Sequence, residues 1–336
     1  MRSKFINFLK IALPLSFGLF LIWYVYGSLE PSEKKDLFSS IKRANYWWVL
    51  ASIGLGVLSH LSRAYRWKYL LDPLGLRPKF ANSFFAVMIG YLINLLIPRA
   101  GELSRCGVLS RYEKMPFTKL FGTVIAERIA DIIILGLIIV GVIISQFEIL
   151  GETISSWMAK LENQASFLYT TLAIGGIISL SVVILYFSFK KSFHHFIHKL
   201  KSLLLSFMEG VKTILKMKSA GKFIFHTLFI WLMYFCMFLL CFFSLPETNP
   251  FNNEMRFAGI LAAFVMGGLS IIFVQGGIGV YPFAIMEVLV LYGISQAPSL
   301  ALGWIIWTSQ TAMVLILGII SLLVVGRFNK KQVYEK

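Results

Sequence analysis

Charge is the property that this sequence has least of. Only 14% of its 336 residues are charged, whereas 57% are hydrophobic; a soluble domain carries about 25% charged residues. The apolar residues also form long runs instead of recurring at the spacing of an amphipathic helix. We therefore expect the lipid bilayer to surround most of the chain, which argues against a soluble globular domain.

Acidic residues are especially few. The sequence has 16 Asp and Glu residues against 32 Lys and Arg residues, which gives a formal net charge of +16. In a soluble protein this excess would suggest a nucleic-acid partner. Here the basic residues lie between the apolar runs, where the positive-inside bias places them. We therefore expect no nucleic-acid partner.

Paired cysteines and catalytic motifs are also missing from the sequence. Its three cysteines form no CxxC pair, which argues against a disulfide framework or a zinc site. There is no HExxH, GxSxG or Walker motif, so we expect no catalytic residue, cofactor or bound metal. His194, His195 and His198 have a spacing that suits a metal, but their lysine-rich surroundings favour a solvated loop. His60 and His226 stand alone and indicate no site.

Long apolar stretches are what the sequence has in abundance. They lie at 8–27, 46–61, 80–97, 118–145, 167–189, 222–245, 257–293 and 298–325. A helix needs about 20 residues to cross about 30 Å of hydrocarbon. The first stretch lacks a small-residue cleavage site, so we expect a retained helix and not a signal peptide. The sequence predicts an all-α integral membrane protein, a single polytopic domain over 1–336 with about six to eight transmembrane segments.

The charges of the connecting segments predict how these stretches cross. The basic segments are the N-terminus, 62–79, 98–119, 190–222 and the tail 327–336, whereas 146–166 and 246–256 are acidic; segment 28–45 is mixed and assigns no side. We therefore expect both termini on the cytoplasmic side of a prokaryotic inner membrane. If 62–79 and 98–119 lie on the same side, 80–97 must enter and return without crossing. The same parity applies to 257–293.

These two interrupted stretches divide the chain into two inverted repeats. The helix-breaking residues gather in them, as Asn94, Pro98 and Gly101 in the first and Gln275, Gly276, Gly277, Gly279 and Pro282 in the second. Repeat one covers 8–145. Region 146–221 holds an acidic outer loop, the span 167–189 that starts repeat two, and a basic loop with an interfacial helix at 203–217. The rest of repeat two covers 222–326. Many transporters have this plan, with the site where the broken segments meet; eight ordinary crossings are the alternative.

Two arginines end the second apolar stretch. Arg63 and Arg66 share one helix face at a spacing of three residues, with Trp67 beside them. Guanidinium groups match phosphate oxygens, so the pair predicts a clamp for a lipid phosphate. The alternative is a positive-inside anchor with an interfacial tryptophan.

The first interrupted stretch supplies a candidate anion site. Pro98 is placed to stop the incoming helix, and Gly101 permits the turn. A helix that begins near Gly101 would point its free N–H groups into the membrane, where they attract an anion. Glu102 and Arg105 are spaced to pair with each other. The alternative is a plain cytoplasmic loop.

The strongest local signal is Glu127, Arg128 and Asp131, inside the long stretch 118–145. They begin about 13 Å along that helix at 1.5 Å per residue. Ionisable groups at this depth cannot face lipid, so they must face the protein interior or water. Glu127 and Asp131 share a face, and Arg128 can reach Asp131. A purely structural ion-pair network is the alternative.

Three glycines within four positions mark the second interrupted stretch. Gly276, Gly277 and Gly279, which follow Gln275, are incompatible with an ordinary helix interior. They permit close backbone approach, and free amides there would bind a head group.

In this order, the four motifs resemble the lysylphosphatidylglycerol synthase transmembrane-region family of flippase-like membrane proteins. The matching stretches are RAYRW from Arg63, NLLIPRAGELSR from Asn94, ERIADIIIL from Glu127 and QGGIGVYP from Gln275. The resemblance implies a membrane region that handles or translocates lipids, including aminoacylated phospholipids or isoprenoid-linked sugars. The sequence departs from the family where Gln275 replaces the usual proline and Pro282 the usual acid. The full synthases also carry a soluble aminoacyl-transferase domain, which we do not expect here.

The sequence thus favours a protein that binds and translocates an anionic phospholipid or an isoprenoid-linked lipid. In this hypothesis arginines neutralise the head-group phosphate, and acids hold the arginines or accept a head-group amine. The arginines are Arg63, Arg66, Arg105 and Arg128; the acids are Glu102, Glu127 and Asp131. One alternative is a membrane-embedded transferase that acts on phospholipid or polyprenyl-linked substrates, with carboxylates open to a donor. Another is a proton-coupled carrier that uses Glu127 and Asp131.

Overall fold

The computed structural model describes residues 2–97, 100–146, 217–251 and 257–330. By its contacts the chain divides into two units, residues 1–139 with 217–336 and residues 140–216, and the account below concerns the first. Several expectations fall outside the described residues: the loop 146–166 beyond its first residue, the span 167–189, the histidines at 194–198, the helix at 203–217, and Pro98. They stay predictions.

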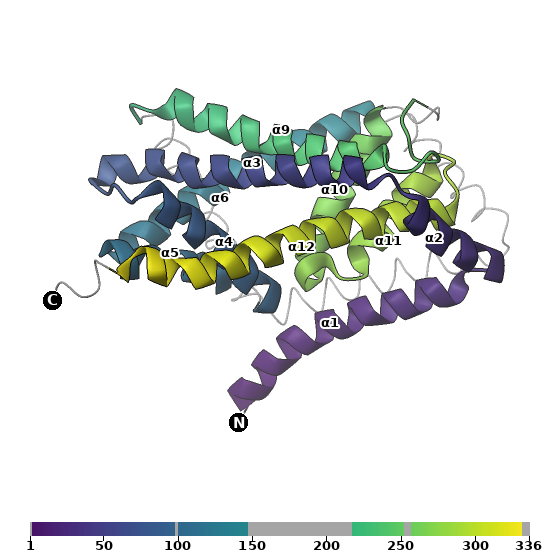
Figure 1. The fold of residues 1–336 in the computed structure, drawn as a ribbon, viewed down its shortest axis with the longest axis horizontal. Helices are drawn as coiled ribbons and strands as arrows, with labels where there is room; N and C mark the ends of the chain where they lie inside the picture. The colour runs from purple at the N-terminus through teal and green to yellow at the C-terminus, as the bar shows by residue number, and fades with distance from the viewer. Residues whose placement is uncertain (1, 98–99, 147–216, 252–256, 331–336) are drawn as a thin grey trace, which may run out of the picture. The chain divides into compact units, whose positions relative to one another are not determined.

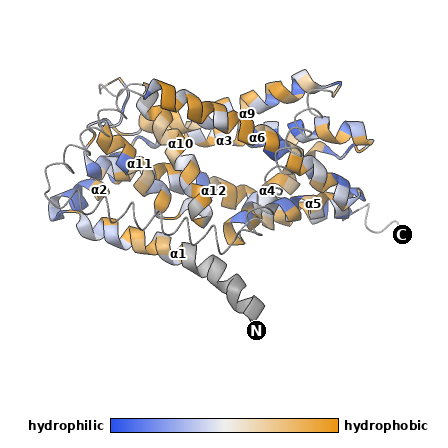
Figure 2. Ribbon diagram, turned by 180° about the vertical axis from the view of Figure 1, so that it is seen from behind, coloured by the Kyte–Doolittle hydropathy of each residue, from blue (hydrophilic) through white to orange (hydrophobic). Residues whose placement is uncertain are grey.

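The described residues are helical, as expected (Figure 1). In chain order the elements are α1 (Arg2–Ser28), α2 (Pro31–Arg43), α3 (Tyr46–Leu71), η1 (Asp72–Leu74), α4 (Phe80–Leu96), α5 (Ala100–Glu113), α6 (Phe117–Ser145), α9 (Ala220–Phe242), α10 (Phe257–Phe273), η2 (Gln275–Gly277), α11 (Val280–Leu291) and α12 (Gln296–Phe328). Among them α6, α9 and α12 are long and apolar enough to cross a membrane; α4 and stretches of α1, α10 and α11 are shorter apolar helices. In Figure 2 most of α9 and α10 is hydrophobic, whereas α2 is largely hydrophilic.

Two helix boundaries differ from the expectation. The second apolar stretch continues as α3 to Leu71, ten residues beyond position 61, so Arg63 and Arg66 lie inside a helix. Their charges have partners in the folded chain, and the helix stops only where Pro73 removes a backbone donor. The mixed segment 28–45 forms α2, which begins with Pro31 and has Glu33 in its first turn, both typical of a helix start.

Helices α3 and α9 pack side by side in antiparallel directions. The Asn45 N–H donates to the Ser244 carbonyl at 2.8 Å near one end. Ser52 Oγ donates to the Met237 carbonyl at 2.7 Å further along. These two contacts pair the start of α3 with the end of α9, so the two helices run alongside each other over most of their length.

Helices α4 and α5 form a tight helical hairpin. The Lys79 N–H before α4 donates to Glu113 Oε1 at the end of α5, at 2.9 Å. Near the turn, a Cβ on Gly101 would lie only 2.2 Å from the Gly90 carbonyl oxygen. The Gly101 N–H donates to Asn94 Oδ1 at 2.8 Å. Stretch 80–97 is thus a single helix, and it is α5 that brings the chain back beside the start of α4; return without crossing the membrane stays a prediction.

Helices α10 and α11 form a second hairpin through η2. Gly259 packs against the ring of Tyr292, and Gly267 packs against Tyr281, so the two helices are antiparallel. The turn contains the expected glycines: Gly276, Gly277 and Gly279 all have a positive φ, between 67° and 72°. This left-handed backbone is what a side chain would disfavour.

The two hairpins meet at their turns. A Cβ on Gly276 would lie 3.5 Å from Leu95 at the end of α4. Their open ends lie at opposite ends of α12. Asn82 in the first turn of α4 exchanges hydrogen bonds with Asn329, just after α12, at 2.8 and 2.9 Å. The second hairpin leads directly into the start of α12, whose 33 residues span about 50 Å.

Candidate functional site

Five charged side chains from three helices meet in the interior. Arg63 and Arg66 come from α3, Arg105 from α5, and Glu127 and Asp131 from α6, and none is more than 7% exposed. The expectation that these acids face inward is confirmed. Burial of each charge alone would be costly, so the cluster is stable only because every charge has an opposite charge in contact.

Arg63 and Arg66 each contact both carboxylates. Arg63 Nη1 donates to Glu127 Oε1 and to Asp131 Oδ2, both at 2.8 Å. Arg66 Nη2 lies 2.8 Å from Glu127 Oε1, and its Nη1 donates to Asp131 Oδ1 at 3.0 Å. The same Nη1 donates to Thr227 Oγ1 of α9 at 2.8 Å. These contacts link α3, α6 and α9.

Arg105 fixes the first hairpin to the same cluster. Its Nη2 donates to Glu127 Oε2 at 2.7 Å, and its guanidinium carbon lies 3.8 Å from the ring centroid of Trp67. This is the geometry of a cation–π contact. Trp67 is fully buried and donates from Nε1 to Thr123 Oγ1 at 2.8 Å. The interpretation of Trp67 as an interfacial anchor is therefore wrong.

The expected pairing of Glu102 with Arg105 is also wrong. Arg105 binds Glu127, and Glu102 instead forms an ion pair with Arg128, with its Oε1 3.0 Å from Nε. The buried Glu127 carboxylate has no water to solvate it, so it draws the nearest guanidinium, and Glu102 at the edge takes the other. Arg128 also approaches Asp131, at 3.8 Å, as the spacing predicted.

The Arg128–Glu102 pair forms the accessible edge of the site. The side chain of Arg128 is 39% exposed and that of Glu102 is 28% exposed, whereas Glu127 is 1% exposed. Both line a small recess of about 10 Å³ together with Tyr91 and Asn94 of α4. Among the described residues, four arginines and three carboxylates make up the cluster, so together they carry one excess positive charge.

Aromatic and hydroxyl groups that border the cluster were missed from the sequence. Tyr91 and Tyr234 approach within 3.5 Å through their hydroxyls, and the ring of His60 lies 4.9 Å from that of Tyr91. His60 therefore does not stand alone, and its Nδ1 is buried without a hydrogen-bond partner. Nor does His226, whose Nδ1 lies 2.8 Å from Ser62 Oγ. The position of His60 three residues before Arg63 was the available signal.

The glycines of the second hairpin form a turn whose backbone groups are partly bonded within the fold. The Gly277 N–H donates to the Val274 carbonyl at 2.8 Å, so that amide is not free for a head group. Trp307 Nε1 donates to the Gly276 carbonyl at 2.6 Å. A Cβ on Gly279 would lie 2.3 Å from the Gly18 carbonyl of α1. Gln275 opens η2. Head-group binding by the remaining amides stays a prediction.

Comparison with known proteins places the chain in a family. The model of the family described as lysylphosphatidylglycerol synthase TM region matches residues 10–318. A UPF0104 membrane protein of Methanocaldococcus jannaschii is 28% identical over 166 residues, which cover 47% of this chain and 48% of that relative, about half its length. No solved structure matches the chain. Because the family match covers nearly the whole chain, this protein belongs to the lysylphosphatidylglycerol synthase TM region family of membrane proteins.

Proposed function

We propose that this protein binds an anionic phospholipid, or another lipid with a phosphate head group, and moves it across the membrane. The observation that carries the proposal is the half-exposed Arg128, which borders the recess and belongs to a cluster with one excess positive charge. A phosphate against the exposed face of Arg128 would neutralise that excess. Charge-assisted, two-pronged contacts to phosphate are what a guanidinium makes best.

In this proposal the arginines divide into two roles. Arg63, Arg66 and Arg105 are bound to Glu127 and Asp131 and hold the helices together. Arg128 meets the lipid, because its present partner Glu102 is itself partly exposed and can be displaced. The freed Glu102 carboxylate then accepts the amine of a head group that has one. A contact to the charged recess thus selects lipids by head group.

The two hairpins suggest the path of the lipid. Non-helical backbone at membrane depth is tolerated only where protein buries it or where it lines a cavity. Hairpins rooted at opposite ends of α12 and meeting at their turns support two inverted repeats with re-entrant segments, and about six to eight spans. We place the protein in the cytoplasmic membrane with both termini on the cytoplasmic side, as the charges of the connecting segments predict.

The transferase alternative needs carboxylates that are open to a donor. Glu127 instead lies within 2.8 Å of three guanidinium groups and is 1% exposed, and Asp131 is bound by two of the same arginines. A carboxylate held in this way has little capacity to accept a further proton from a substrate. The geometry therefore supports lipid binding better than catalysis.

Lipid exchange between leaflets tests the proposal. Purified protein is reconstituted with a fluorescent phosphatidylglycerol, and the fraction accessible to a membrane-impermeant quencher is followed over time. Arg128→Ala is expected to lower the exchange rate about tenfold, the value of one charge-assisted contact. Arg111→Ala, an exposed position on α5, serves as the matched control and should exchange like the wild type. Wild-type exchange by Arg128→Ala protein refutes the site.

A further inference from the structure

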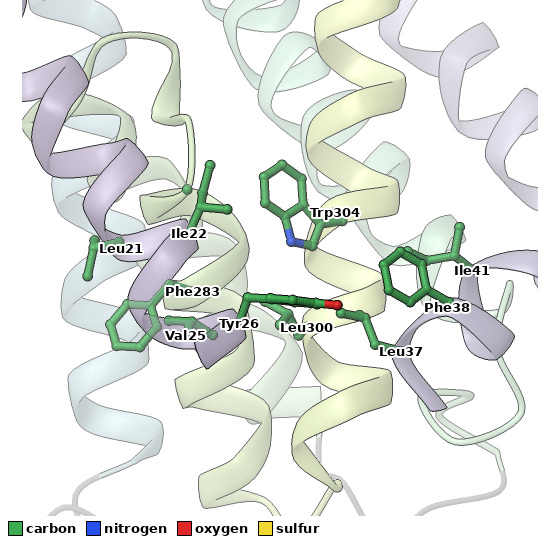
Figure 3. A pocket seen from close by; sticks show the side chains of 11 residues that line it. Leu21, Ile22, Val25, Tyr26, Leu37, Phe38, Ile41, Phe283, Leu300 and Trp304 are labelled. Carbon is green, nitrogen blue, oxygen red and sulfur yellow. The ribbon is translucent and has the colours of Figure 1, made fainter. Parts of the chain in front are cut away.

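We propose that a hydrophobic cavity between α1, α2, α11 and α12 binds one acyl chain of a phospholipid with an anionic head group. This inference rests on the proposed function, because it takes the ligand to be a lipid, but it concerns a second site. Figure 3 shows the cavity, with side chains of all four helices around one space.

The size and lining of the cavity fit a hydrocarbon chain. Its volume is about 230 Å³, and its walls include Ile22 of α1, Phe38 of α2, Phe283 of α11 and Trp304 of α12. No charged side chain lines it. Apolar cavities of about 150 Å³ stay dry and take up molecules such as benzene, because water inside would lack polar partners. A larger apolar cavity in a membrane protein is therefore expected to hold several methylene groups of a lipid.

The polar atoms around the cavity are few. Tyr26 and Trp304 carry the only polar side-chain atoms among the lining residues. The amphipathic helix α2 supplies Leu37, Phe38 and Ile41 to the wall. A helix that turns apolar residues inward and charged residues outward is suited to cover a lipid chain at the membrane interface.

A cation next to the cavity is the reason to expect a lipid with an anionic head group. Lys34 Nζ lies 5.1 Å from the ring centroid of Tyr26, which lines the cavity. Helix α2 has four basic and two acidic residues, and its Arg43 is bound to Glu247. Lys34 thus provides a positive charge beside the cavity. A lysine binds phosphate as a point charge, so an anionic lipid is favoured over a neutral one.

This cavity is distinct from the arginine cluster. On α12 it is lined by Leu300 and Trp304, whereas Gly318 of the same helix packs against Leu92 of α4. Trp304 and Gly318 are separated by about 21 Å along the helix at 1.5 Å per residue. The cavity and the recess beside Arg128 share no lining residue, so the cavity is a second site.

Photolabelling in proteoliposomes tests the inference. The probe is phosphatidylglycerol with a diazirine in one acyl chain, and labelled peptides are identified by mass spectrometry. In the wild type the label is expected on α1, α2, α11 and α12 around the cavity. This first measurement needs no variant. Label spread evenly over exposed apolar residues of α6 and α12, without enrichment at the cavity, overturns the inference.

Two matched pairs of variants sharpen the test. Leu21→Trp fills the cavity and should lower labelling of the Phe283 peptide about fivefold, because the indole occupies the space of the chain. Leu19→Trp, on the same helix but 52% exposed and outside the cavity, should label like the wild type. Lys34→Ala should weaken labelling by the anionic probe more than Lys35→Ala does. Equal labelling by a phosphatidylcholine probe overturns the preference for an anionic head group.

The same proteoliposomes separate this inference from the proposed function. Lipid exchange that is sensitive to Arg128→Ala, with no enrichment of label at the cavity, refutes the second site and leaves the proposed function standing. Enriched labelling at the cavity without any lipid exchange refutes translocation and supports the cavity as a lipid site.

Discussion

Arg63 Nη1 lies 2.8 Å from both Glu127 Oε1 and Asp131 Oδ2, so one nitrogen bridges two carboxylates that are one helical turn apart. Glu127 and Asp131 therefore lie on the face of α6 that points into the site. This contact also explains how charged groups are tolerated inside a long apolar helix: Glu127 is neutralised by guanidinium groups from α3 and α5, and Asp131 by guanidinium groups from α3. The buried network connects four helices, whereas Arg128 lies at its accessible edge. The contribution of the network to stability and the contribution of Arg128 to lipid binding can therefore be tested with different variants.

Removal of one buried carboxylate should lower the free energy of unfolding of the protein. Glu127→Gln leaves three guanidinium groups short of a negative charge, and loss of one partner of a buried ion pair costs about 3–5 kcal/mol. We expect a large fall in the midpoint of thermal unfolding in detergent. Glu102→Gln, at the partly exposed edge, should cost about 1 kcal/mol or less.

The double variant Arg105→Gln with Glu127→Gln distinguishes charge imbalance from lost packing. If the excess positive charge causes the loss, the double variant should be more stable than Glu127→Gln alone. Equal stability of Glu127→Gln and Glu102→Gln would contradict the buried network.

Much of this arrangement could be predicted from residue patterns. The long runs predicted a helical membrane protein, and the inward face of Glu127 and Asp131 followed from the cost of charge in lipid. The glycines at 276, 277 and 279 correctly placed the turn of the second hairpin. These features depend on local sequence or on the bilayer, so one chain is enough to infer them.

The pairing of side chains could not be predicted in the same way. Arg105 lies three residues from Glu102 and 22 from Glu127, yet it binds Glu127. That choice depends on how the first hairpin packs against α6, which local spacing does not encode. Helix α2 was missed for a different reason. Its mixed charges do not indicate which side of the membrane it lies on, and the segment was considered only for that. Pro31 and Glu33 nevertheless form a helix-start signal.

Exchange of the two edge charges should separate structure from lipid binding. In the double variant Glu102→Arg with Arg128→Glu the ion pair between positions 102 and 128 can re-form, so the double variant should be more stable than Arg128→Glu alone. Lipid exchange should stay about tenfold low, because the cation has moved to α5 and no longer lies beside Asp131 and Tyr91. Restored exchange would mean that Arg128 acts only as a structural partner of Glu102.

The glycine at the first hairpin turn should not accept a methyl group. In Gly101→Ala the new Cβ would lie 2.2 Å from the Gly90 carbonyl oxygen, which is backbone and cannot move aside alone. We expect a loss of about 1–3 kcal/mol, the usual cost of overpacking. Gly107→Ala is the control on the same helix, since its Cβ would meet nothing within 4 Å. Unfolding midpoints of the two variants, measured side by side, check the difference; equal midpoints would refute the close approach.

Trp67→Phe should report the contacts of Trp67 in α3 with Arg105 of the first hairpin and with Thr123 of α6. Phenylalanine keeps an aromatic face for Arg105 but leaves Thr123 Oγ1 without the Nε1 donor at 2.8 Å. We expect a loss of about 1 kcal/mol for the hydrogen bond, against about 3–5 kcal/mol for Trp67→Ala. Trp47→Ala, at a position 79% exposed, should leave the unfolding midpoint unchanged. A Trp67→Ala variant as stable as Trp47→Ala would rule out the buried role.

Cysteine accessibility should establish how the first hairpin sits in the membrane. Arg77 and Arg111 lie near its two open ends, where the Lys79 N–H is bonded to Glu113. If the hairpin enters and returns, cysteines at both positions must react with an impermeant maleimide from the same side. If α3 crosses the bilayer, a cysteine at Asp36 in α2, which precedes α3, must react from the opposite side. The native Cys106, Cys236 and Cys241 are first replaced, and each single-cysteine protein is labelled in sealed, oriented vesicles before and after permeabilisation.

Labelling of Arg77→Cys and Arg111→Cys from opposite faces would mean that α4 and α5 together cross the bilayer. That result would remove the parity on which the two inverted repeats depend, whereas labelling from one face, with Asp36→Cys on the other, supports a re-entrant segment beside the arginine cluster.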